Sequence, residues 1–162
     1  MSLRRLVRLM LTAGRIADAA PPLPEAAPGR PPLLAGSLHV RHVDAGSCNG
    51  CEIEVGAAFG PVYDAERYGA RLVASPRHGD AVLVTGVVTR NMLEPLRRTV
   101  AAMPEPRMVL AVGDCACSCG VFRGAIGVAG AAGDVVDVDL EVPGCPPEPG
   151  AIVEALRRVT GR

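Results

Sequence analysis

Residues 81–113 read AVLVTGVVTRNMLEPLRRTVAAMPEPRMVLAVG and contain two short apolar runs, each of which ends at a glycine. Ala81–Thr85 and Met108–Val112 have the length and composition of buried strands, and Asn91–Met103 between them has the pattern of a helix with a basic end. Strands that are apolar throughout are buried on both faces, which is typical of a parallel sheet covered by helices. The segment therefore predicts a strand–helix–strand unit of an α/β domain.

Other patterns extend this unit in both directions along the chain. We expect further strands at Leu38–Val43, Arg71–Ala74 and Val135–Leu140, and further helices at Cys51–Ala58 and Pro149–Val159. Ligands of parallel sheets bind where loops leave the carboxyl ends of the strands, so those loops are the expected place for a site.

Composition and charge exclude several functional classes. The 162 residues include 17 basic and 17 acidic side chains, so the basic excess of nucleic-acid-binding domains is missing and we expect no nucleic-acid partner. Two Tyr, two Phe and no Trp leave little material for a base-stacking surface. Hydrophobic residues make up 49% of the chain, enough for one core, and no run reaches the roughly 18 uncharged apolar residues of a membrane span.

The first 36 residues differ in character from the rest. A short amphipathic helix is expected within residues 3–17, and residues 20–36, with six prolines, have the composition of an extended linker. The helix either packs on the domain or a partner, or lies as a basic helix on a membrane surface. We therefore divide the chain into an N-terminal helix and linker, residues 1–36, and a compact α/β domain, residues 37–162.

Arg8 and Arg15 interrupt the apolar stretch that a secretory signal peptide would need within residues 1–20. We therefore expect a cytoplasmic chain whose thiols stay reduced. An even number of cysteines is typical of disulfide-bonded chains, but six thiols in a cytoplasmic chain indicate metal or redox chemistry instead. The cysteines are Cys48, Cys51, Cys115, Cys117, Cys119 and Cys145.

Cysteines follow three of the expected strands. Cys48 and Cys51 come after the first strand, Cys115 comes after Met108–Val112, and Cys145 lies in the loop EVPGCPPEP. Strand ends at one edge of a parallel sheet converge, so four thiolates can meet at one site. Zinc sites typically combine two Cys-x-x-Cys pairs, or one such pair with two histidines. This chain has one pair, and Cys115 and Cys145 come singly from distant loops, which favours an iron–sulfur cluster over zinc. A thioredoxin-like redox pair is a third alternative, but it leaves two of these thiols without a role.

Four motifs together resemble one protein family. They are GSCNGCEIEV at residues 46–55, SPRHGDAVLVTG at 75–86, AVGDCACSCGVF at 111–122 and PGCPPEP at 143–149. The chain resembles the small cluster-binding subunit shared by complex I, where it is the 20 kDa or B subunit, and the [NiFe] hydrogenases. Because the first motif reads CNGC rather than two adjacent cysteines, the resemblance is closest to the membrane-bound energy-converting hydrogenase and formate hydrogenlyase branch.

The resemblance implies a flavodoxin-like three-layer domain with a mostly parallel sheet and one [4Fe–4S] cluster. The ligands that it implies are Cys48, Cys51, Cys115 and Cys145. The cluster would transfer electrons beside the catalytic or quinone site of a large subunit, so the chain would be the iron–sulfur subunit of an oxidoreductase without a complete active site of its own.

The same resemblance implies the surroundings of the chain. The expected partners are a large catalytic subunit of the [NiFe]-hydrogenase or complex I 49 kDa type, a ferredoxin-like iron–sulfur subunit and membrane subunits of the same complex. The chain would lie peripherally on the inner face of the cell membrane through that complex. A structural zinc-binding or assembly protein without a redox role stays the alternative function.

Residues near the motifs are candidates for a supporting role. Glu52 is a candidate for proton-coupled electron transfer beside the cluster, with ordinary first-turn charge on a helix as the alternative. Arg77 and His78, in the loop before the AVLVT strand, are further candidates, because histidine titrates near neutral pH and could couple proton transfer to redox chemistry. The alternative is a surface loop at the opposite end of the sheet. His39 and His42 are expected on the surface of a strand.

Two further thiols crowd the third site. Cys117 and Cys119 are interpreted as buried or spectator thiols. Cys117, two residues from Cys115, can point elsewhere if this loop is extended. Cys119, four residues away, would share a face with Cys115 only if the segment were helical. The alternative is that one of them replaces Cys115 as a ligand or helps during cluster loading.

Overall fold

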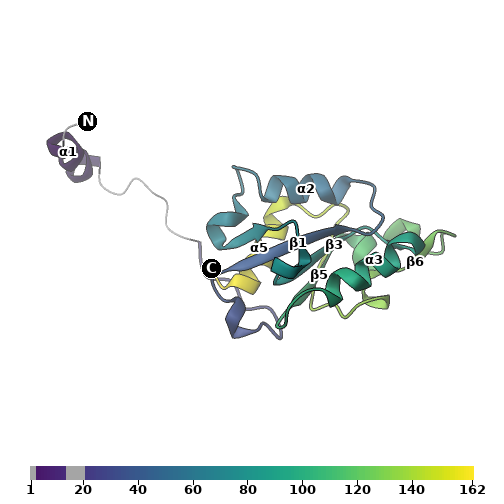
Figure 1. The fold of residues 1–162 in the computed structure, drawn as a ribbon. Helices are drawn as coiled ribbons and strands as arrows, with labels where there is room; N and C mark the ends of the chain where they lie inside the picture. Colours follow the sequence, from purple (N-terminus) through teal and green to yellow (C-terminus); the bar gives the residue numbers. More distant parts are fainter. Residues whose placement is uncertain (1–2, 14–20) are drawn as a thin grey trace.

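The computed structural model describes residues 3–13 and 21–162, and its centre is a parallel sheet (Figure 1). Five strands lie in the order β2-β1-β3-β5-β7, and each neighbouring pair is parallel. This is the 2-1-3-4-5 strand order of flavodoxin-like domains, so the expected fold class is confirmed. The strands are β1 (Leu38–Asp44), β2 (Ala70–Leu72), β3 (Ala81–Thr85), β5 (Met108–Val112) and β7 (Leu140–Val142).

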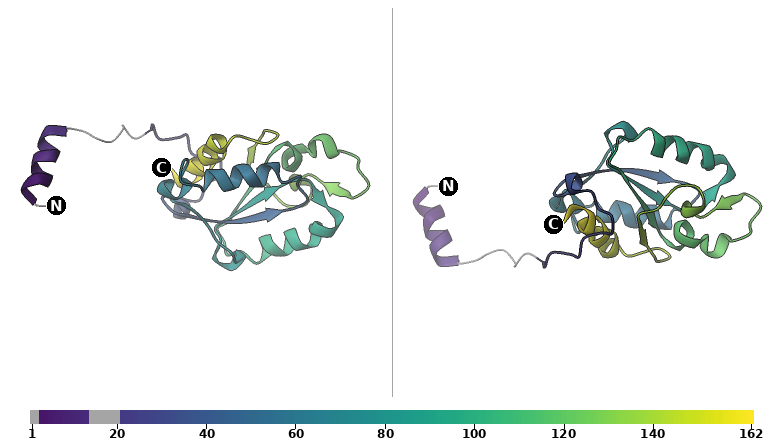
Figure 2. Two further views of the ribbon diagram at one scale, coloured as in Figure 1. Left: turned by 90° about the horizontal axis from the view of Figure 1, so that it is seen from above. Right: turned by 90° about the horizontal axis from the view of Figure 1, so that it is seen from below.

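Helices cover both faces of this sheet. α2 (Gly50–Ala58) and α5 (Pro149–Thr160) pack on one face, and α3 (Arg90–Ala101) packs on the other. Both views of Figure 2 show α2 and α3 on opposite sides of the strands. The arrangement has three layers, as the strand–helix–strand pattern predicts.

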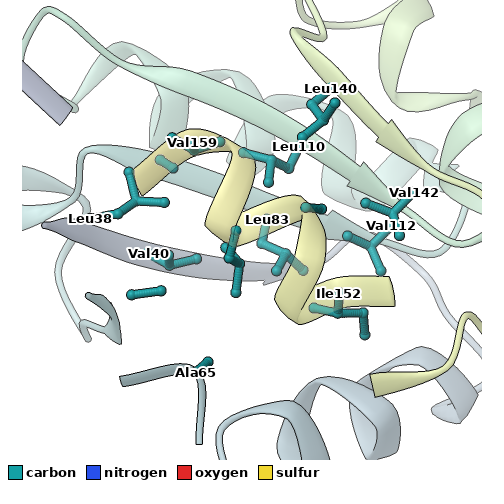
Figure 3. Packing of buried hydrophobic residues seen from close by; sticks show 14 of the residues in the cluster. Leu38, Val40, Ala65, Leu83, Leu110, Val112, Leu140, Val142, Ile152 and Val159 are labelled. Atoms are coloured by element: carbon teal, nitrogen blue, oxygen red, sulfur yellow. The ribbon is translucent and has the colours of Figure 1, made fainter. Parts of the chain in front are cut away.

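Alternate side chains of the central strands β3 and β5 contribute to two separate hydrophobic clusters. Leu83 and Leu110 contribute to the cluster under α5, while Val82 and Val109 contribute to the cluster under α3. Figure 3 shows the first of these clusters, in which Ile152 and other side chains of α5 lie against the strands. Because the side-chain period of a strand is two, a strand covered on both faces must be apolar at every position, which explains the runs AVLVT and MVLAV.

Shorter elements complete the domain. β4 (Val88–Thr89) and β6 (Val128–Gly130) form an antiparallel pair, and α4 (Asp114–Ser118) is a helix of little more than one turn. The 3-10 turns are Pro32–Leu34, Ala65–Tyr68, Pro76–His78, Gly120–Phe122 and Ala132–Asp134.

The strand expected at Val135–Leu140 is wrong, because the observed strand, β7, begins only at Leu140. Ahead of it, the Asp139 carboxylate accepts the backbone N–H of Val109 at 2.7 Å, and the Asp139 N–H donates to the Val109 carbonyl at 2.9 Å. The valines before it pack into the cluster under α3 instead of pairing with β5. The alternation of valine and aspartate therefore comes from packing at the sheet edge.

The N-terminal residues have two parts in the structure. α1 (Leu3–Ala13) is an amphipathic helix whose side chains are exposed, while residues 14–17 of the expected helix lie outside the described residues. Residues 21–36 run along α5, with Ala27 and Leu34 buried in the core and the Ala27 N–H bonded to the Arg158 carbonyl at 2.9 Å. The division at residue 36 stays a prediction.

None of the helices within residues 3–13 and 21–162 combines the length and the hydropathy that crossing a bilayer requires.

Candidate functional site

Four cysteines from the segments that follow β1, β5 and β7 line one small cavity at the carboxyl edge of the sheet. The cavity measures about 90 Å³ and has almost entirely apolar and sulfur-bearing walls. Its lining consists of Ser47, Cys48, Gly50, Cys51, Gly86, Asp114, Cys115, Gly144, Cys145 and Pro146. The loops after β1, β3, β5 and β7 all contribute, so the structure brings together the four thiols that the sequence singles out.

The loop after β1 is shaped by its own hydrogen bonds. The Asp44 carboxylate accepts the N–H groups of Gly46 at 2.9 Å and Ser47 at 2.8 Å, and the Asn49 N–H donates to the Ser47 hydroxyl at 3.0 Å. Asn49 adopts a left-handed backbone conformation with φ 72°, which turns the chain into α2 and places Cys51 in its first turn. Burial alone would raise the pKa of Asp44, but these hydrogen bonds outweigh it and hold that pKa below its usual value.

The loops that carry Cys115 and Cys145 are tied to each other. The N–H of Asp114 donates to the carbonyl of Gly144 at 2.8 Å, and the N–H of Gly144 donates to Oδ1 of Asp114 at 2.7 Å. Each cysteine follows one of these two residues directly in the sequence. The separation of the two thiols is therefore fixed by paired bonds rather than by loose loops.

Glycine is required where the loops approach most closely. Gly113 has φ +92°, and a Cβ at this position would lie 2.5 Å from Sγ of Cys51. Gly86 has φ +74°, and its Cβ would lie 2.4 Å from the backbone nitrogen of Ser47. Both the backbone angle and the space therefore exclude a side chain, and the thiols can gather around the cavity.

Burial dominates the electrostatics of the inner thiols. It raises the pKa of Cys51 to about 12, with Glu52 and the other three cavity thiols adding to the rise. Burial also raises the pKa of Cys115, followed by the effect of Cys145. Cys48 and Cys145 are exposed. Within residues 3–13 and 21–162, no three His, Cys, Asp or Glu side chains lie close enough together to hold a single metal ion.

The two extra thiols lie outside the cavity lining. Cys117 packs against the core under α3, and its Sγ lies 3.7 Å from the Ala111 carbonyl. Cys119 follows α4 in a left-handed conformation, φ 66°, and is buried in a small cluster with Val87. Because the segment is helical, Cys119 lies on the same side as Cys115: its N–H donates to the Cys115 carbonyl at 3.0 Å, and Cys115 packs against the same cluster. In the helical turn of α4, residues two apart point to different sides, so Cys117 faces away from Cys115.

A partly buried polar network lies beside the Cys-x-x-Cys pair. Glu52 accepts hydrogen bonds from the hydroxyl groups of Ser47, at 2.5 Å, and Thr85. Nε2 of His42 lies 2.9 Å from the Thr85 hydroxyl and 3.7 Å from the Glu52 carboxylate. A hydroxyl has one hydrogen, and Thr85 gives it to Glu52, so His42 must donate to Thr85 from Nε2.

This network contains two residues that sequence reasoning missed. The expectation that His42 is a surface residue is wrong, since its side chain is mostly buried and burial lowers its pKa, opposed in part by Glu52 and Asp44. Thr85 is fully buried inside the apolar run AVLVT. A hydroxyl at the end of such a run, next to the loop with the thiols, is the signal that could have identified it.

Arg77 and His78 are not brought to the cavity. Both are exposed in the turn Pro76–His78 before β3, at the end of that strand opposite to Thr85. Nearby, the backbone N–H and Nδ1 of His39 lie 2.8 and 3.2 Å from the Asp80 carboxylate. Of the three supporting candidates, the structure places only Glu52 beside the cysteines.

Comparison with known proteins gives a consistent picture. Residues 48–159 match the family described as NADH ubiquinone oxidoreductase, 20 Kd subunit. The chain is 43% identical over 125 residues to formate hydrogenlyase subunit 7 of Escherichia coli, a match that covers 77% of this chain and 49% of that protein. It is 46% identical over 124 residues to the probable membrane-bound hydrogenase subunit mbhJ of Pyrococcus furiosus, covering 76% and 74%. The chain thus spans about half the length of the first relative.

Solved structures show the same fold. A chain from the membrane-bound sulfane sulfur reductase, an archaeal respiratory membrane complex, superposes with a TM-score of 0.69 at 30% identity, covering 79% of this chain and 71% of that one. A chain of an NAD+-reducing [NiFe]-hydrogenase superposes with a TM-score of 0.58 at 20% identity, covering 72% and 86%. The second likeness concerns the fold alone.

Proposed function

Because this chain belongs to the NADH ubiquinone oxidoreductase 20 kDa subunit family, we propose that it is the iron–sulfur subunit of a membrane-associated oxidoreductase and that it binds one [4Fe–4S] cluster. The observation that carries the proposal is the convergence of Cys48, Cys51, Cys115 and Cys145 on one cavity. Iron–sulfur clusters are held by four cysteine thiolates, and this donor set has the required number and softness.

The walls of the cavity fit such a group. Gly113 leaves room beside Cys51, and Gly86 and Gly144 let two further loops approach the thiols. The paired bonds between Asp114 and Gly144 hold two of the ligand loops in register. When bound, the cluster takes up and releases single electrons at a potential set by burial, charge and hydrogen bonds.

Residues of this chain would provide the burial, charge and hydrogen bonds that set the potential. Cys51 and Cys115 lie deeper than the other two thiols and would lower the polarity on the inner side of the site. Ser47 and Thr85 donate to Glu52 and so fix a carboxylate one residue from Cys51. The proposal includes a role for Glu52 in proton transfer beside the cluster.

Exposed apolar side chains near the site support a partner subunit. Ile53, two residues after Cys51, is 64% exposed, and Val121, six residues after Cys115, is 83% exposed. A large catalytic subunit, of the [NiFe]-hydrogenase or complex I 49 kDa type, would cover this side of the chain. A ferredoxin-like subunit and membrane subunits would complete the assembly and hold it at the inner face of the cell membrane.

The test is metal analysis of the complex purified anaerobically from its host. The proposal expects a brown preparation with iron and acid-labile sulfide each at about four per chain, and an electron paramagnetic resonance signal upon reduction. A colourless preparation with stoichiometric zinc would contradict it and favour a structural or assembly role.

A further inference from the structure

α1 has an unusually broad apolar surface for a helix of its length. At 100° per residue, Leu3, Leu6, Val7, Leu9, Met10, Leu11 and Ala13 occupy a sector of about 200°. All of the six large side chains in this sector are exposed, from 41% for Leu6 to 80% for Leu11. A helix that packs on one neighbour needs an apolar stripe of only about 100°.

The remaining sector of α1 carries only positive charge. Arg4, Arg5 and Arg8 share it with Thr12, and the helix contains no acidic residue. The whole chain is neutral, with 17 basic and 17 acidic side chains, so this local excess is not a reflection of the overall composition. The surface that accepts α1 must therefore offer negative charge beside a broad apolar region.

An 11-residue helix also needs to be covered in order to persist. Isolated helices shorter than about 12–15 residues are marginal in water, because the cost of nucleation is spread over few hydrogen bonds. α1 lacks an acidic residue in its first turn and a basic residue in its last turn, so its ends gain nothing from the helix dipole. Burial of the apolar sector is the stabilisation that remains.

We propose that α1 lies in the interface of an anionic lipid membrane, with its leucine-rich sector in the acyl region and its arginines among the headgroups. A half-immersed helix is contacted by lipid over about half its circumference, which matches the 200° sector better than a protein groove does. Each arginine near an anionic surface strengthens binding, and the arginine side chain is long enough to reach outward from the buried stem.

The segment that joins α1 to the α/β domain limits how far apart the two can lie. The Arg157 guanidinium donates to the Pro22 carbonyl at 2.7 Å, and the Gly36 N–H donates to the Thr160 carbonyl at 2.7 Å, so residues 22–36 are fastened to α5. The eight residues between Ala13 and Pro22 span at most about 30 Å when extended. Bound to lipid, α1 would therefore keep the α/β domain close to the membrane surface.

The test is sedimentation of the full-length chain with phosphatidylcholine vesicles prepared with and without phosphatidylglycerol. Strong binding is expected only with phosphatidylglycerol, and it should weaken as the salt concentration rises. Replacing Arg4, Arg5 and Arg8 together by Gln should reduce the affinity about a hundredfold, since each arginine contributes roughly tenfold or less at such a surface.

A matched triple variant serves as the control. Arg71, Arg97 and Arg98 are exposed on the domain, and replacing them by Gln removes the same charge while leaving vesicle binding unchanged. Leu6→Ser with Met10→Ser should abolish binding even with the arginines intact. The inference fails if the chain binds neither type of vesicle or both equally, if the two arginine triples have equal effects, or if α1 crosslinks to a protein subunit instead of lipid in the native complex. None of these readouts depends on the cluster.

Discussion

Asp114 and Gly144 are joined by two hydrogen bonds of opposite direction, one from each backbone N–H. Asp114 begins α4 after β5, and Gly144 lies in the loop after β7, so the bonds connect neighbouring strands at the edge of the sheet where the cavity lies. Cys115 and Cys145 are the next residues in each loop. The relationship sets the spacing of two proposed ligands before any cluster binds.

Replacing Asp114 should loosen this spacing. Asp114→Ala removes the acceptor for the Gly144 N–H and should lower the free energy of unfolding by about 1 kcal/mol, while the release of iron to a chelator becomes faster. Asp114→Asn keeps an acceptor oxygen and serves as the control. Equal rates of iron release in the two variants would show that the side-chain bond does not hold the site.

The Thr85 hydroxyl should matter more than its place in an apolar strand indicates. Thr85→Val preserves the shape but leaves Glu52 without one donor, which should cost about 1–3 kcal/mol of stability. Thr85→Ser retains the hydroxyl and should lose much less. Chemical denaturation of both variants checks this, and a Val variant as stable as the wild type would contradict the described network.

Stability should fall as the pH drops below the ordinary pKa of histidine because of His42. Burial lowers its pKa from 6.5, Glu52 and Asp44 raise it in part, and Arg41 lowers it further. The unfolded chain therefore binds a proton at a higher pH than the folded chain does, so the free energy of unfolding is full above about pH 7 and decreases as the pH falls through 6.5.

Thermal unfolding of two variants at several pH values checks the role of His42. His42→Asn should flatten the pH dependence between about pH 7 and 5. His78→Asn removes an exposed histidine at the other end of β3 and should leave the slope as it is. If both variants keep the wild-type slope, another group causes the dependence.

In the iron-free chain, the cysteines should differ in how fast they react with an alkylating agent. Cys48 and Cys145 are exposed, whereas Cys51 is buried with its pKa raised to about 12. At equal pH Cys51 then has about a thousandfold less thiolate than an unperturbed thiol, and the thiolate is the reacting form. Mass spectrometry after brief alkylation should find Cys48 and Cys145 modified first; early labelling of Cys51 would contradict the described burial.

Most strands of the sheet can be predicted from the sequence, because each is marked by its own residues and their immediate neighbours. Ala81–Thr85 and Met108–Val112 are strands with the expected ends, since continuous apolar runs bounded by glycine have few other uses. The prediction of a strand at Val135–Leu140 is wrong, because alternation alone does not reveal which neighbour a strand pairs with. The pair formed by β4 and β6 has too few residues for any periodicity.

The candidate site, too, can be predicted from the sequence only in part. The four cysteines could be found because each follows a strand end, and the parallel topology brings those ends to one edge. The network of His42, Thr85 and Glu52 joins residues up to 43 positions apart in the sequence, and no local pattern indicates such contacts. Arg77 and His78 directly precede β3, so in a parallel sheet they lie at the edge opposite to the cysteines, as the surface-loop alternative expects.

Serine substitution of each cysteine tests the central claim. Oxygen replaces the soft sulfur donor that iron prefers, so Ser at position 48, 51, 115 or 145 should remove the cluster or make it labile. Cys117→Ser and Cys119→Ser are the matched controls, because these thiols lie in the same segment but outside the cavity lining.

The most direct measurement is the electron paramagnetic resonance signal of the reduced cluster, with iron and sulfide contents, in all six variants purified within the complex. The account predicts loss of the signal for the four cavity cysteines and about four iron and four sulfide per chain for the two controls. A Cys115→Ser variant that keeps its cluster, together with a Cys119→Ser variant that loses it, would contradict the proposed ligand set.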